Sequence, residues 1–148
     1  MGRVINPERA GKERNRLARS VVSAIRQLSQ QDEVTDRTRD LAAYIVEALG
    51  AINGTIDPTV EAWEKRGYWL KADRYRMDWL WTEKQGDKMR KALLDEDWGA
   101  VAACMAEIAA RLEKVNELKR TVIEAPWDGA WQRMISSNES LNSHSQSP

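Results

Sequence analysis

Hydrophobic residues recur at helical spacing along most of this chain, and the densest run lies between Trp63 and Trp81. Apolar and small side chains there follow a repeat of three and four residues, which is the repeat of one face of an α-helix. These positions are Tyr68, Ala72, Tyr75, Trp79, Thr82, Gly86, Met89 and Leu93. Lys71, Arg74 and Asp78 lie on the opposite side. The pattern predicts one long amphipathic helix whose first half is rich in aromatic residues.

Capping signals divide the rest of the chain into further helices. Asn6, Thr35, Asp57 and Asp97 are residue types that satisfy the free backbone amides at a helix start, and Pro7 and Pro58 suit a first helical position. They predict helices from Pro7 to about Gln30, from Asp36 to about Ile56, from Pro58 onward, and from the Asp95–Asp97 turn to Pro126. Gly67 either ends a short helix, 58–66, or lies inside a single helix that reaches Leu94. We favour a break there because bulky Tyr68 and Trp69 follow.

The C-terminal part of the sequence has a different character. Trp127 and Trp131 follow Pro126, and we expect a short turn that lays both indoles over one end of the bundle. Residues 136–148 are rich in Ser and Asn and have little to bury, which predicts a disordered tail. The chain is therefore predicted to be all-α: a single-domain, largely antiparallel bundle of four to five helices over residues 1–135, followed by the tail.

Composition narrows the class of protein. The 148 residues carry 23 basic and 23 acidic side chains, so the net charge is zero. Cys104 is the only cysteine, which excludes a disulfide framework. The N-terminal residues lack the apolar core of a secretory signal, and no apolar run has the length of a membrane span. We expect a soluble cytoplasmic protein that does not act at a membrane.

The residues that most enzymes need are missing. His144 is the only histidine and falls in the predicted tail, which leaves no scaffolded base for a Ser or Cys nucleophile and no His-containing metal site. A pair of carboxylates, Glu61 with Glu64 or Asp73 with Asp78, stays open as an acid–base site. The sequence favours a non-catalytic protein without a metal or cofactor.

Three kinds of partner remain. The leading prediction is binding to another protein or to a second copy, because the chain has seven Trp and no Phe, and Trp is enriched at interfaces. The second is nucleic acid, bound by a basic stripe at helical spacing on the first helix: Arg9, Lys12, Arg16, Arg19 and Arg26. The third is a planar or cationic small ligand in the aromatic helix. The candidate ligand or partner surface comprises Trp69, Asp73, Tyr75, Arg76 and Trp79. The alternative for these rings is that they fill the core in place of Phe.

Overall fold

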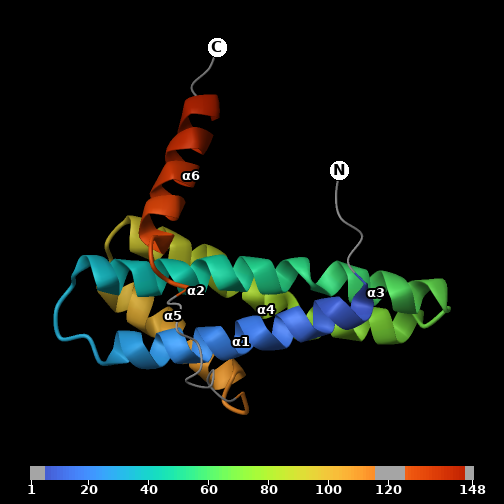
Figure 1. The fold of residues 1–148 in the computed structure, drawn as a ribbon. Helices are drawn as coiled ribbons and strands as arrows, with labels where there is room; N and C mark the ends of the chain where they lie inside the picture. Colours follow the sequence, from blue (N-terminus) through green and yellow to red (C-terminus); the bar gives the residue numbers. More distant parts are fainter. Residues whose placement is uncertain (1–5, 116–125, 146–148) are drawn as a thin grey trace.

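The computed structural model describes residues 6–115 and 126–145, and every regular element in these residues is an α-helix. The helices are α1 (Pro7–Ser29), α2 (Asp36–Gly54), α3 (Ile56–Lys65), α4 (Trp69–Leu94), α5 (Trp98–Arg111) and α6 (Ala130–Ser145). Figure 1 shows α1 to α4 lying along one long axis, with α5 packed at one end and α6 standing away from the bundle. The prediction of an all-α, single-domain bundle is confirmed.

The helix starts lie close to the positions that the capping signals predict. Asn6 and Asp97 each accept a backbone hydrogen bond from the first turn of the helix that follows. Thr35 and Thr38 form a reciprocal box, in which the backbone N–H of each donates to the hydroxyl of the other, at 2.9 and 3.3 Å. These side chains satisfy amides that have no partner within the helix, so α1, α2 and α5 begin as expected.

Three boundaries test the finer expectations. Gly67 separates α3 from α4 with φ +82°, a left-handed conformation that glycine adopts without strain, so the break is confirmed. Helix α3 begins at Ile56, ahead of the predicted Pro58, because proline is tolerated anywhere in a first turn that needs no internal N–H bond. Helix α5 ends at Arg111 rather than at Pro126. Residues 116–125 of that longer prediction lie outside the described residues.

Helix α2 is the centre of the bundle. It contacts α1, α3, α4 and α6, and the five consecutive residues 41–45 are all buried. A run of that length covers more than one face of a helix, so α2 is enclosed on several sides. Gly86 of α4 faces it: a Cβ added there would lie 3.6 Å from Cβ of Leu49. Helices α2 and α4 therefore lie close together at Gly86.

The C-terminal segment differs from the expectation of a disordered tail over 136–148, since α6 continues to Ser145. Two contacts with α2 hold its beginning. The carboxylate of Asp40 accepts hydrogen bonds from the backbone N–H of Gly129 at 3.1 Å and of Trp131 at 3.0 Å. Arg133 pairs with both carboxylate oxygens of Glu47, at 2.9 and 3.3 Å. Because starting a helix is the costly step, an anchored first turn lets a Ser- and Asn-rich segment continue as helix.

The two C-terminal indoles do cover the bundle. Trp127 is buried and meets Tyr44 of α2 edge-on, with ring centroids 6.2 Å apart. Trp131 is partly buried against the same core. Both indoles therefore cover the bundle as predicted, and they lie at the base of α6.

Candidate partner interface on helix α4

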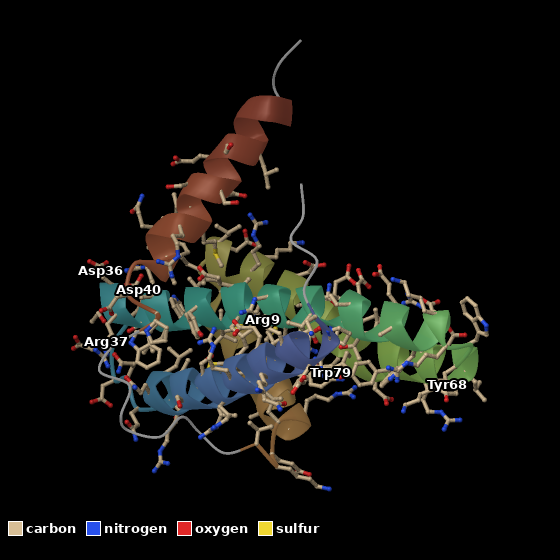
Figure 2. The ribbon with its side chains drawn as sticks, turned by 45° about the vertical axis from the view of Figure 1, so that its right-hand side comes forward. Arg9, Asp36, Arg37, Asp40, Tyr68 and Trp79 are labelled. Carbon is tan, nitrogen blue, oxygen red and sulfur yellow. The ribbon has the colours of Figure 1, made fainter. Side chains whose placement is uncertain are left out.

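The inner face of α4 carries the predicted aromatic stripe. Ala72 is fully buried, and Tyr75 and Trp79 are partly buried against α3. Trp63 of α3 meets Tyr75 edge-on, with ring centroids 4.9 Å apart. Tyr68 is the exception at 55% exposed, because it precedes the first turn of α4. Figure 2 shows Tyr68 at the far end of the bundle and Trp79 nearer its middle.

Arg14 of α1 occupies the space beside these rings. Its guanidinium carbon lies 5.2 Å from the centroid of Tyr75 and 5.6 Å from that of Trp79. The same group donates hydrogen bonds to Oγ1 of Thr55 at 3.0 Å, to the carbonyl oxygen of Thr55 at 3.0 Å and to Oγ1 of Thr59 at 2.8 Å. Burial of this guanidinium lowers the pKa of Arg14. The site is thus a buried cation between two aromatic faces and a helix end.

Hydrogen bonds account for the position of Arg14. Thr55 is the residue at which α2 ends and α3 begins, and its hydroxyl and carbonyl oxygens both accept hydrogen bonds from Arg14. Within the described parts of the chain, no carboxylate forms an ion pair with Arg14, so the helix end and the ring faces take that role. The cation that Tyr75 and Trp79 attract is therefore a side chain of this protein, and the space foreseen for a cationic ligand beside them is taken by Arg14.

The outer face of α4 is apolar as well, and it is exposed. Five of the seven exposed large hydrophobic residues of the described chain lie between positions 68 and 80. Trp69 is 61% exposed, Leu70 73%, Met77 74% and Leu80 42%. Trp81 is not part of this surface, because it is partly buried against the core and stacks on Trp79 with ring centroids 6.3 Å apart. We call the four exposed residues of α4, Trp69, Leu70, Met77 and Leu80, the outer stripe.

The structure splits the candidate ligand or partner surface into two groups. Trp69, Asp73 and Arg76 are exposed on the outside of α4, whereas Tyr75 and Trp79 face inward. Arg76 also reaches back to Glu64 of α3, with contacts of 3.3 and 3.5 Å. The five residues therefore do not line one pocket.

Sequence reasoning missed three members of the outer stripe, Leu70, Met77 and Leu80. The signal was available: at 100° per residue, Leu70 and Met77 lie almost opposite Tyr75 and Trp79. An apolar residue on the side opposite a predicted core face indicates a second covered surface.

The basic stripe of α1 is partly neutralised within the chain. Arg16 forms a two-pronged contact with Glu13 at 2.6 and 3.1 Å, and this hydrogen bond lowers the pKa of the Glu13 carboxyl. Nε of Arg19 is buried and has no hydrogen-bond partner among the described residues. Arg9 and Lys12 are exposed, as is Arg26 further along the helix. The structure does not present the five cations as one free surface.

Other features of the described chain indicate a functional site less strongly than the outer stripe does. An apolar groove of about 430 Å³ lies between α1 and α5. Of the large hydrophobic residues that line it in the described chain, only Val34 is exposed. Burial raises the pKa of the Cys104 thiol, the opposite of what a reactive cysteine needs. Among residues 6–115 and 126–145, no three His, Cys, Asp or Glu side chains come together as metal ligands.

Two further findings complete the description. None of the described helices combines the length and the apolar character required to cross a membrane. Comparison with known proteins gives no match, whether to a family model, a curated protein or a solved structure. The function therefore has to be inferred from the surface of the chain itself.

Proposed function

We propose that this protein is a non-catalytic association module that forms a homodimer through the outer stripe of α4. The observation that carries the proposal is the exposure of Trp69, Leu70 and Met77, each above 60%, on one side of one helix. Isolated exposed apolar residues are ordinary, but a contiguous group on a folded surface is characteristic of a protein interface. Trp and Met are also among the residue types enriched at interfaces.

The inner face of the same helix supports this proposal. Arg14, Thr55 and the rings of Tyr75 and Trp79 already satisfy one another, so the inward aromatic residues need no external partner. The outer stripe has no such counterpart among the described residues. A second protein surface would remove its apolar area from water, at roughly 25 cal/mol for each Å² buried.

Binding of nucleic acid is the weaker alternative. It would use Arg9, Lys12, Arg16, Arg19 and Arg26, but Arg16 is paired with Glu13 and Arg19 is partly buried. Phosphate binding draws its affinity from cations that are free to displace counterions. The exposed apolar surface on α4 is thus the stronger feature.

Sedimentation equilibrium of the wild type and of Met77→Asp tests the proposal. We expect the wild type to be a dimer at micromolar concentration, and Met77→Asp to weaken the dimer by at least about 100-fold, because a carboxylate would be buried without a partner. Val34→Asp is the matched control: it places the same charge on an exposed apolar residue, 46% exposed, that is not part of the outer stripe. It should leave the dimer intact.

Circular dichroism of each variant establishes that the helices survive, which is expected because Met77 is exposed. A wild type that stays monomeric up to about 100 μM would contradict the proposal. So would a Met77→Asp variant that dimerises as well as Val34→Asp.

A further inference from the structure

The residues that border the outer stripe are arranged so that the stripe can pair with itself. On a helical wheel centred on Met77, Leu70, Arg74 and Asp78 lie on one side of the stripe. Arg74 and Asp78 are both exposed there. One edge of the stripe therefore carries a positive and a negative charge one helical turn apart.

Two copies of a helix that pack antiparallel about a two-fold axis bring the same edge of each together, in opposite order. Arg74 then faces Asp78 of the second copy, and Asp78 faces Arg74 of the second copy. Two equivalent ion pairs form at once, as they do beside the core of an antiparallel coiled coil. The charges on this edge thus match the same edge of a second copy.

The apolar residues fit the same register. With the axis at the level of Arg76, Leu70 and Met77 both lie along the line of contact with the second copy. On the other edge, Trp69 lies beside Lys84 of the second copy, where an ammonium group over an indole is favourable. Met77 lies next to the axis, in contact with its own copy. A parallel pair would instead place this edge of each helix on opposite sides of the interface, so that Arg74 and Asp78 of the two copies would not meet.

The length of the open surface also suits this arrangement. Gln85 is buried and donates a hydrogen bond to Glu107 of α5, so α5 covers α4 from that point on. The antiparallel pair uses residues 69–84 alone, about 24 Å of helix. The second α4 thus ends at the level where α5 begins to cover the first.

We infer that the homodimer is an antiparallel α4–α4 pair whose two-fold axis lies at the level of Arg76. This inference rests on the proposed function and names the partner surface as the same stripe on a second copy. It assigns Arg74 and Asp78 as the residues that fix the orientation of the two chains.

Charge exchange tests the ion pairs. Arg74→Asp and Asp78→Arg each place like charges opposite one another, and each should weaken the dimer by at least about tenfold. The double variant restores opposite charges and should return the dissociation constant to within about threefold of the wild type. Glu83→Arg is the control, since it makes the same charge change on an exposed residue of α4 outside the stripe. It should have little effect.

Cross-linking tests the direction of the pair. In a Cys104→Ala background, Met77→Cys should join two chains through a short bismaleimide, whereas Lys84→Cys should not, because its two copies would lie about 24 Å apart. A parallel pair would cross-link at both positions. A dimer that cross-links through Lys84→Cys, or through neither cysteine, or that the double charge variant fails to restore, overturns the antiparallel pairing but keeps the homodimer. A monomeric wild type overturns both.

Discussion

Helix α2 and the first half of α4 both carry apolar residues on more than one side, yet their surroundings differ. Residues 41–45 of α2 are buried on every side because α1, α4 and α6 lie against them. The first half of α4 is buried only where α3 and Arg14 cover it, and Leu70 and Met77 on its other side are more than 70% exposed. Two helices with apolar residues on several sides therefore differ in how much of their surface the rest of the described chain covers.

The difference shows what an apolar pattern means. A residue pattern indicates which sides of a helix need to be covered, and the packing of the other helices decides which of them are covered within the described chain. At one end, α6 folds back and covers α2 through Asp40 and Arg133. At the other end, no described element covers the outer stripe. The need to cover apolar surface, which favours the packing of α6 on α2, is also the basis of the proposed dimer.

The largest expected contrast is between Leu49 of α2 and Leu70 of α4. Leu49 is fully buried, so Leu49→Ala should lower the free energy of unfolding by about 2–5 kcal/mol through lost burial and a cavity. Leu70→Ala, at a site that is 73% exposed, should change it by less than about 0.5 kcal/mol. Urea unfolding at a concentration below dimerisation measures both. Equal losses would mean that α4 is enclosed in the monomer as α2 is.

Arg14 supplies the next test, because it covers the inner side of α4. Arg14→Met keeps a long side chain but removes three hydrogen bonds and the charge beside Tyr75 and Trp79. We expect a loss of about 2–3 kcal/mol, since the carbonyl of Thr55 loses its donor at 3.0 Å and keeps only the Thr59 hydroxyl at 3.5 Å. Thermal unfolding followed by circular dichroism measures it. A loss below about 0.5 kcal/mol would show that the rings pack equally well without the cation.

Asp40 tests the cover of α2. Asp40→Ala removes the acceptor for two backbone amides at the start of α6, a contact worth about 1–2 kcal/mol by analogy with helix caps. Hydrogen exchange should rise in residues 130–141 and stay low in α2 itself. Asp36→Ala is the control, because its side chain is fully exposed near the same end of α2 (Figure 2). Exchange in α6 that stays unchanged in Asp40→Ala would assign the docking to Trp127 alone.

The smallest effect is expected where the two compared helices touch. A Cβ at Gly86 would lie 3.6 Å from Cβ of Leu49, an ordinary contact, so Gly86→Ala fits without moving α2. Alanine also favours the helix over glycine, and we expect stabilisation of up to about 1 kcal/mol in urea unfolding. Destabilisation would mean that α2 and α4 need a closer approach than this distance indicates.

Much of the fold follows from short-range signals in the sequence. Asn6, Thr35 and Asp97 cap helices that begin where they predict, and Gly67 breaks the chain where a left-handed residue is needed. The helix over residues 136–145 could not be predicted from such signals, because its first turn is held by Asp40, which lies far earlier in the chain. Composition alone describes what a segment buries and cannot include an anchor supplied by another helix.

The candidate site was predicted in part for a similar reason. Trp69, Asp73 and Arg76 do lie on an exposed surface, and Tyr75 and Trp79 do attract a cation. The pattern could not identify that cation as Arg14, because α1 and α4 meet only in the folded chain. It also gave Leu70 and Met77 no role, because each apolar residue was assigned to a single inner face.

The contacts of Arg14 have a consequence for how the chain folds. They tie α1 to the junction of α2 and α3, which lies 41 residues further along the sequence. A fragment that starts at α2 would lack these donors, and we expect it to keep its helices but to lose the fixed angle between α2 and α3.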